Sequence, residues 1–274
     1  MNLLYIDCFA GISGDMTLGA FLDLGVSEKV LRDGFAQLKG VSGYRLKIEK
    51  TIKNGITGTK VDIILNEESD HTHDHDKGED HPHEHRHDNS HSHSHSHDVN
   101  LETVEKIIED SGLADEVKAL SKKIFRYVAE AEAKVHGKPL EAVHFHEVGA
   151  VDSILDIVGT AICLSALKVD HIIASPLHTG TGFVHCQHGK IPVPVPATME
   201  ILKENQIPFY STGIQKELVT PTGAAIVAGL ADAFGPMPEM EARAIGYGAG
   251  TRELEIPNLL RMVMGKKKKI RKQC

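Results

Sequence analysis

The sequence predicts an α/β fold in which a mixed β-sheet is flanked by helices. Two observations favour this class over an α+β arrangement, which is the alternative. Apolar residues at helical spacing alternate along the chain with short, β-branched runs that are typical of strands. Two of the strand-like runs flank an Asn54-Gly55 pair, which favours an antiparallel hairpin and therefore a sheet with mixed pairing.

The N-terminal part of the predicted α/β domain covers residues 1–66. Ser27 is placed to cap one of its two helices, and Gly25 ends the other. The expected helices lie at residues 16–25 and 28–38. The expected strands lie at residues 3–7, 44–53 and 58–65.

Residues 67–98 form an insert that consists mostly of His, Asp, Glu and Ser, with a few other polar residues, Gly78 and Pro82, and without Ala, Val, Leu, Ile or Met. Such a segment buries too little apolar area to offset its ordering entropy, so we expect a disordered loop. Eleven of the 18 histidines lie in it: His71, His73, His75, His81, His83, His85, His87, His91, His93, His95 and His97. Imidazoles in a flexible chain suit Ni, Cu, Zn and Co, so we expect this insert to bind metal ions. The alternative interpretations of the insert are a purification tag and a solvated spacer.

Residues 99–264 supply the remainder of the domain, and residues 265–274 form a basic tail. Asn100 is placed to cap the first helix of this part. The helices are expected at residues 100–109, 115–136, 151–167, 196–205 and 220–234. The strands are expected at residues 171–177, 182–186, 190–195, 240–250 and 257–265.

Composition excludes several classes of protein. A net charge of −8 and an aromatic content of 5% argue against nucleic-acid binding. The N-terminus lacks a basic signal-peptide region, and no apolar run reaches the ~18 residues of a membrane span. The four cysteines are far apart and form no CxxC pair, so we expect a cytoplasmic protein with reduced thiols and no zinc ribbon.

A glycine-rich turn follows the first predicted strand. It carries Asp7, Gly11, Ser13, Gly14 and Asp15 between that strand and a helix. Carboxylates beside a glycine loop and a helix start can hold a metal ion together with an anion such as phosphate. The alternative is a tight structural turn in which Asp15 is an ordinary N-cap.

A second constellation combines imidazoles and carboxylates within thirteen residues. His144 and His146 are two apart and share a face of an extended segment, and Glu147 follows them. Asp152 and Asp156 share one face of the next helix. This density predicts a site for a borderline metal ion, whereas capping and surface roles for each residue are the alternative.

Two further motifs could contact ligands. His185, Cys186 and His188 are candidate ligands for a soft or borderline ion. Thr220, Thr222 and Gly223 begin a small-residue helix whose N–H groups could bind a phosphate or carboxylate, although a plain capped helix is an equally simple interpretation.

Taken together, the motifs resemble one family. YIDCFAGISGDM, VHFHEVGAVDSILDIVG, HGKIPVPVPAT, ELVTPTGAA and GYGAGTRELEIPNLLR are similar to segments of the LarC nickel-insertion proteins, up to about Met264. The resemblance implies a nickel chelatase that inserts Ni(II) into pyridinium-3,5-bisthiocarboxylic acid mononucleotide, with consumption of CTP and a divalent ion such as Mn or Mg. It also implies a C-terminal CTP-binding domain as a partner, and we expect a homo-oligomer without nucleic-acid or membrane partners.

Residue chemistry then assigns expected roles within this activity. Asp7, Asp15 and Glu147 are the expected catalytic residues, with Asp7 and Asp15 holding a hydrated cation or the substrate phosphate. The expected anion cradle comprises Gly11, Ser13, Gly14, Thr220, Thr222 and Gly223. The expected metal ligands of the folded part are His144, His146, Asp152, Asp156 and His188. The insert is expected to bind nickel and pass it to them through His71, His73, His75, His91, His93, His95 and His97. A nickel store or metallochaperone, and a phosphohydrolase built on Asp7, Asp15 and Asp152, are the rival interpretations.

Overall fold

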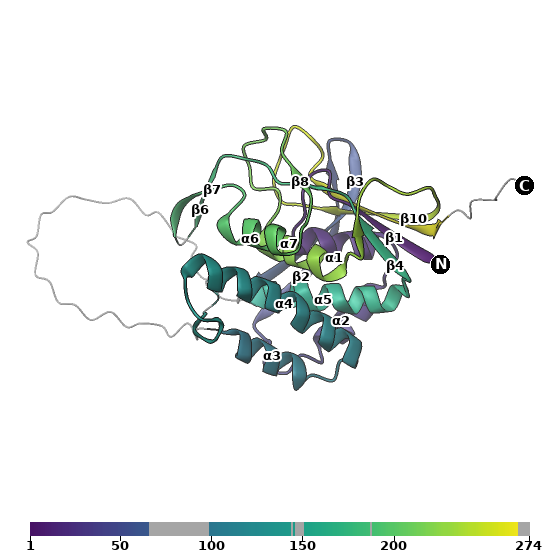
Figure 1. Cartoon of the computed structure of the whole chain (residues 1–274). Coiled ribbons are helices and arrows are strands. Elements are labelled where there is room, and N and C mark those ends of the chain that lie inside the picture. Colours follow the sequence, from purple (N-terminus) through teal and green to yellow (C-terminus); the bar gives the residue numbers. More distant parts are fainter. Residues whose placement is uncertain (66–98, 144, 146–150, 187, 268–274) are drawn as a thin grey trace, which may run out of the picture.

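A mixed, seven-stranded sheet forms the centre of the computed structural model, which describes residues 1–65, 99–143, 145, 151–186 and 188–267 (Figure 1). From one edge to the other, the strands are β2 (Tyr44–Lys53), β3 (Ile56–Leu65), β10 (Met240–Ala249), β11 (Leu259–Lys267), β1 (Asn2–Asp7), β4 (His171–Ala174) and β9 (Ala233–Phe234). β1 is parallel to β4 and antiparallel to β11, so the predicted α/β class with mixed pairing is confirmed.

The β2–β3 hairpin has the turn that the sequence predicted. Lys53 pairs with Ile56 across it, and Asn54 and Gly55 both have positive φ, at 48° and 82°. These values are those of the two-residue turn that matches the twist of paired strands. The second strand starts at Ile56 rather than at residue 58, because the ladder continues to the turn.

Helices gather on one side of the sheet (Figure 1). α1 (Gly14–Asp23) packs against β10 and β3, and α5 (Val151–Leu167) packs against α1. α4 (Asp115–His136) lies against α5 and contacts α6 (Pro196–Glu204) and α7 (Pro221–Leu230). The outer helices are α2 (Glu28–Phe35), which packs on α5, and α3 (Leu101–Glu109), which packs on α4.

One core joins these layers. Ile6, Phe21, Phe125, Leu155 and Ile226 are fully buried within it. Their removal from water supplies the main stabilisation, at roughly 1.5–3 kcal/mol for each large apolar side chain. None of the helices in the described ranges has both the length and the apolar character needed to cross a bilayer.

Short elements complete the structure. β5 (Leu177–His178) pairs in parallel with β8 (Phe209–Tyr210), and β6 (Phe183–Cys186) forms a hairpin with β7 (Gly189–Pro192). A 3₁₀ turn spans Leu140–Ala142. The predicted strand at residues 171–177 is therefore divided between β4 and β5, and the run at 190–195 is a strand only as far as Pro192.

The helix predicted at residues 220–234 is wrong at its end. α7 stops at Leu230, and Ala233–Phe234 forms edge strand β9 beside β4. Asp232 fixes this exit, because its Oδ2 atom accepts a hydrogen bond from the Ile172 amide at 2.8 Å and lies 2.8 Å from His171 Nδ1. Sheet pairing thus overrides the local preference for helix.

Candidate functional site

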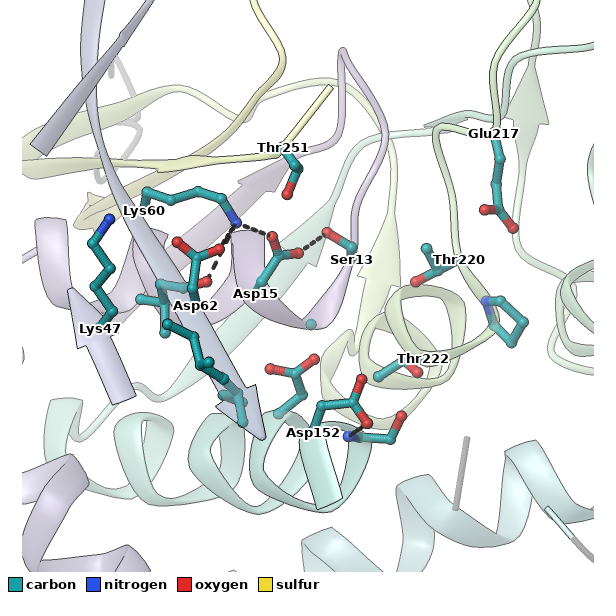
Figure 2. A pocket seen from close by; sticks show the side chains of 17 residues that line it. Ser13, Asp15, Lys47, Lys60, Asp62, Asp152, Glu217, Thr220, Thr222 and Thr251 are labelled. Carbon is teal, nitrogen blue, oxygen red and sulfur yellow. Dashed lines mark hydrogen bonds and ion pairs between the residues drawn. The ribbon is translucent and has the colours of Figure 1, made fainter. Parts of the chain in front are cut away.

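A cleft of about 560 Å³ opens where three helices begin beside strand β3 (Figure 2). Ser13, Gly14 and Asp15 come from the start of α1, Asp152 and Asp156 from the first turns of α5, and Thr220 and Thr222 from the start of α7. Its other polar lining residues are Lys47, Lys60, Asp62, Ser153, Glu217 and Thr251. Helix N-termini carry partial positive charge and unpaired N–H groups, so three of them at one cleft favour an anionic ligand.

The loops that begin α1 and α7 are joined by backbone hydrogen bonds. The amide of Ile12 donates to the Leu218 carbonyl at 2.9 Å, and the amide of Thr220 donates to the Ile12 carbonyl at 3.2 Å. Gly11 is required at this contact, because it has φ of +86° and a Cβ there would lie 1.9 Å from the Leu218 oxygen. The two helix starts are therefore held side by side by main-chain contacts.

The backbone N–H groups of Gly11 and Gly223 donate hydrogen bonds within these two loops. The Gly11 amide donates to the Cys8 carbonyl at 3.0 Å, and the Gly223 amide donates to Thr220 Oγ1 at 3.1 Å as part of the α7 cap. Their structural contribution is therefore to hold the loops. Their expected role in an anion cradle stays a prediction, and Ser13, Gly14, Thr220 and Thr222 are the cradle residues that line the cleft.

Lys60 is the central cation of the cleft. Its Nζ atom lies 2.8 Å from Asp15 Oδ2 and 2.8 Å from Asp62 Oδ1, and Figure 2 shows the side chain reaching between these two carboxylates. Burial acts to lower the Lys60 pKa, but the Asp15 carboxylate, followed by that of Asp62, outweighs it, so the pKa is raised. Lys60 therefore stays charged.

Asp15 is held from both sides. Its Oδ2 atom faces Lys60, and its Oδ1 atom accepts a short hydrogen bond from the Ser13 hydroxyl. Ser13, not Asp15, occupies the N-cap position of α1, and the helix begins two residues earlier than the sequence predicted. Asp15 consequently projects from the first turn into the cleft, where a carboxylate can meet a ligand.

Asp156 lies deeper in the same cleft. Gly14 allows the approach, because a Cβ at Gly14 would lie 2.1 Å from Asp156 Oδ2. The other oxygen, Oδ1, is buried and accepts no hydrogen bond within the part of the chain that the structure describes. Burial raises the Asp156 pKa well above its usual value, and the carboxylates of Asp15 and then Asp152 add to this rise.

A buried carboxyl oxygen that accepts no hydrogen bond from the described residues, such as Asp156 Oδ1, could bind a cation. Carboxylates are the ligands that Mg²⁺ and Mn²⁺ prefer, and binding would replace the proton on Asp156. In the described ranges, however, no three His, Cys, Asp or Glu side chains are arranged to enclose an ion. The cleft therefore offers open carboxylates near an anion-binding region rather than a closed metal centre.

Asp7 lies apart from this cleft. It ends β1 opposite Arg261 of β11, whose Nε atom donates to Asp7 Oδ2 at 3.0 Å. Asp7 is not among the residues that line the cleft with Asp15 and Asp152, so the cleft gives no support to the trio of Asp7, Asp15 and Asp152 on which the phosphohydrolase interpretation depends. A catalytic role for Asp7 stays a prediction.

His188 also lies outside the cleft, in a small neighbouring cavity with His136. His144, His146 and Glu147 fall outside the described residues, as do all the histidines of the 67–98 insert. The expected roles of these residues are therefore untested.

Sequence reasoning missed several residues that line the cleft, chiefly Lys47, Lys60, Asp62, Glu217 and Thr251. A signal existed for two of them, because Lys60 and Asp62 alternate with apolar residues along a predicted strand and share one face. Only the pairing of β3 beside α1 shows that this face meets Asp15.

Comparison with known proteins gives a consistent result. The family described as nickel insertion protein matches residues 4–274. The chain belongs to this family. The pyridinium-3,5-bisthiocarboxylic acid mononucleotide nickel insertion protein of Acetivibrio thermocellus is 50% identical over 98% of this chain and 61% of its own length. The proteins of the same name from Clostridium kluyveri and Clostridium acetobutylicum are 50% and 55% identical, over 99% and 97% of this chain.

The chain thus spans 61–64% of the length of these nickel insertion proteins. No solved structure matches it. Family membership agrees with the resemblance seen in the sequence motifs. The cleft formed by the three helix starts and their carboxylates therefore belongs to a member of a nickel insertion family.

Proposed function

We propose that this chain inserts Ni(II) into pyridinium-3,5-bisthiocarboxylic acid mononucleotide, acting as a nickel chelatase that forms the nickel-pincer cofactor. The observation that carries the proposal is its identity of about 50%, over nearly its whole length, to proteins that bear this name. Nickel is cargo in this reaction, so the protein has to bind it and release it again.

The cleft supports this proposal chemically. A mononucleotide with two thiocarboxylic acid groups is strongly anionic. The three helix starts and Lys47 favour such a ligand, whereas the five carboxylates of the lining oppose it, so its binding would depend on a divalent cation bound beside it. We place its phosphate at Ser13, Gly14, Thr220 and Thr222. The carboxylates of Asp15, Asp152 and Asp156 do not enclose an ion on their own, so a divalent cation such as Mn²⁺ or Mg²⁺ at this side of the cleft would take further ligands from the phosphate and water, and it would neutralise phosphate charge.

The chain's own residues have distinct tasks in this scheme. Lys60 orients the Asp15 carboxylate across their 2.8 Å contact. Asp156 gives up its proton as the cation arrives, so its buried Oδ1 gains a partner. His144, His146 and Glu147 remain our candidates for the residues that receive nickel from the histidine-rich insert.

The proposal also includes CTP, and it concerns the part of the relatives that this chain does not cover. We infer that CTP binds to a C-terminal domain corresponding to the part of the relatives that this chain does not cover. A cytoplasmic location and a homo-oligomeric state complete the proposal, and cell fractionation and light scattering would test them.

A nickel-insertion assay on the purified chain tests the proposal. Substrate, Ni(II), Mn²⁺ and CTP are supplied with and without the C-terminal part of the Acetivibrio thermocellus relative, and the nickel-bearing product is measured by mass spectrometry. Product formation supports the proposal. Nickel binding by residues 70–98 without product under either condition would favour the nickel-storage interpretation.

A further inference from the structure

A second space, of about 210 Å³, adjoins the cleft, and we call it the side pocket. The two spaces share the lining residues Ser13, Asp15, Glu217, Thr220 and Thr251, and Figure 2 shows Ser13, Asp15 and Thr251 beside one another at this boundary. The residues that line only the side pocket are Met16, Leu218, Gly250, Arg252 and Asn258. The last three belong to the GYGAGTRELEIPNLLR motif, to which the proposed function gives no task.

The loop that carries this motif is held by hydrogen bonds. The Gly250 amide donates to the Asn258 carbonyl at 3.0 Å, and Asn258 Nδ2 donates to the Arg252 carbonyl at 2.9 Å. From the end of β2, Lys53 Nζ lies 3.4 Å from both the Thr251 and the Arg252 carbonyl oxygens, and the lysine side chain is only 7% exposed. This wall of the side pocket is therefore formed before a ligand arrives, so little ordering entropy is lost on binding.

Asn258 gives the side pocket a buried hydrogen-bond acceptor. The residue is 6% exposed, and it packs so closely on Gly250 that a Cβ there would lie 2.8 Å from Asn258 Oδ1. The Arg252 carbonyl can only accept, so its contact identifies Nδ2 as the donor and leaves Oδ1 as the other polar atom of the amide. Among the described residues, none donates to Oδ1. This oxygen can accept from a ligand that carries a hydroxyl group.

The charges of the side pocket disfavour an anion. Arg252 is the cation of its lining, but its Nη2 atom lies 3.3 Å from Glu217 Oε2 and is already neutralised by that carboxylate. Asp15 adds a second carboxylate to the lining. Carboxylate and amide oxygens accept readily from hydroxyl groups, and an acidic side chain binds the ribose hydroxyl in dinucleotide-binding folds. A neutral ligand rich in hydroxyl groups therefore fits this lining better than phosphate does.

The shape of a mononucleotide agrees with this preference. In a β-mononucleotide the base and the 5′ carbon leave one face of the ribose, whereas the 2′ and 3′ hydroxyl groups leave the other. The diol can thus enter the side pocket while the phosphate and the pyridinium ring stay in the larger cleft, with Ser13 and Thr220 at the boundary. Met16 and Leu218, 3% and 5% exposed, supply apolar contacts for the carbon atoms of the sugar.

We propose that the side pocket binds the ribose diol of the mononucleotide, with Asp15 and Asn258 accepting from its hydroxyl groups and Thr251 adding a further hydroxyl contact. This inference rests on the proposed function for the identity of the ligand, but sugar binding can be measured without nickel and without product formation.

Methyl NMR of the full chain tests the inference, with Met, Leu and Ile methyl groups labelled and Mg²⁺ present. Ribose 5-phosphate should shift the signals of Met16 and Leu218 in the side pocket together with those of Ile63 and Ile64 in the cleft. Inorganic phosphate should shift only the cleft signals. We expect 2-deoxyribose 5-phosphate to bind about 3- to 10-fold more weakly than ribose 5-phosphate, because one hydroxyl contact is lost.

A matched pair of threonine variants separates the sugar contact from the fold. Thr251→Val should weaken binding of ribose 5-phosphate about 3- to 10-fold and leave that of inorganic phosphate unchanged. Thr57→Val, at a similarly exposed position outside both spaces, should match wild type. Asn258→Ala should weaken ribose 5-phosphate in the same way, while the signals of buried Ile6 and Ile226 stay in place and report an intact fold.

Three results would each overturn the inference. Ribose 5-phosphate leaves Met16 and Leu218 unshifted, or it binds no more tightly than its 2-deoxy form, or Thr251→Val and Asn258→Ala both bind it as wild type does.

The readout also separates the two proposals. A chain that inserts nickel while its side pocket ignores ribose 5-phosphate would refute only the sugar site. A chain that binds ribose 5-phosphate in the side pocket but makes no nickel-bearing product would refute only the proposed activity.

Discussion

Asp156 shows how a single side chain reports the electrostatics of the cleft. Its pKa lies well above 3.8 because burial, followed by the Asp15 and Asp152 carboxylates, opposes ionisation in the folded protein. The folded state therefore holds this proton more tightly than the unfolded state does. Wild-type stability must then fall as the pH rises from about 4 towards the folded-state pKa, and this loss persists above it.

Asp156→Asn should remove that loss. We expect the free energy of unfolding of the variant to exceed that of wild type at pH 8, since the neutral amide has no proton to lose as the pH rises. The two proteins should be nearly equal in stability near pH 4. Urea denaturation at both pH values measures the difference.

The control for this change is Asp33→Asn, on the exposed outer helix α2, which should alter stability by less than about 0.5 kcal/mol at either pH. A difference between Asp156→Asn and wild type that is the same at pH 4 and pH 8 would contradict the account of Asp156.

Gly14 carries a second prediction at this scale. Gly14→Ala would place a Cβ 2.1 Å from Asp156 Oδ2, so either the carboxyl or the helix start has to move. We expect a loss of about 1–3 kcal/mol in the free energy of unfolding, as for other overpacked sites. Gly235→Ala is the matched control, because nothing lies within 4 Å of its added Cβ, and urea denaturation should find it close to wild type.

Individual cleft residues were predictable only in part. Asp15, Asp152 and Asp156 stand out in the sequence because carboxylates beside a glycine turn and on one helix face indicate a site. Lys60 shares a strand face with Asp62, but this signal does not indicate a site, since a lysine on such a face is ordinarily a solvated residue. Its partners belong to α1 and β3, and their contact depends on the tertiary fold.

At the scale of elements, the start of α7 links stability to ligand binding. Thr220 caps this helix by accepting a hydrogen bond from the Gly223 amide at 3.1 Å, and it also lines the cleft. Thr220→Ala should lower the free energy of unfolding by about 1 kcal/mol. It should also weaken binding of the substrate mononucleotide, because the helix start is one of the three that favour an anion.

Ser27→Ala separates these two effects. Ser27 caps α2 by accepting from the Lys29 amide, and α2 lies outside the cleft lining. We expect a similar loss of stability with unchanged mononucleotide affinity in calorimetric titration. Equal affinity of Thr220→Ala and Ser27→Ala for the mononucleotide would contradict the role assigned to the α7 start.

Elements with strong local signals were the ones predicted well. The Asn54-Gly55 hairpin and the helix at Asp115–His136 follow from turn chemistry and from apolar spacing. The boundary after Leu230 failed, because β9 exists only by pairing with β4, which lies some sixty residues earlier in the chain. The residues around Ala233 do not indicate by themselves that this segment pairs with β4.

At the scale of the whole molecule, the sheet order explains why the cleft could not be derived from sequence. β3 pairs with β10, and β1 lies between β4 and β11, so the first and the last of the described strands are neighbours in the middle of the sheet. This order places the starts of α1, α5 and α7, which are distant in sequence, at one cleft. The α/β class was predictable from alternating elements, whereas their order depends on packing of the completed core.

The most direct test of the central claim is a comparison of cleft variants in the nickel-insertion assay, with the C-terminal part of the relative, CTP and Mn²⁺ present. Mass spectrometry of the nickel-bearing product should show Asp15→Asn reduced about 10- to 100-fold, since Asp15 is assigned to the cation and is oriented by Lys60. Asp33→Asn should match wild type. Undiminished product formation by Asp15→Asn would contradict the claim that this cleft is where nickel insertion takes place.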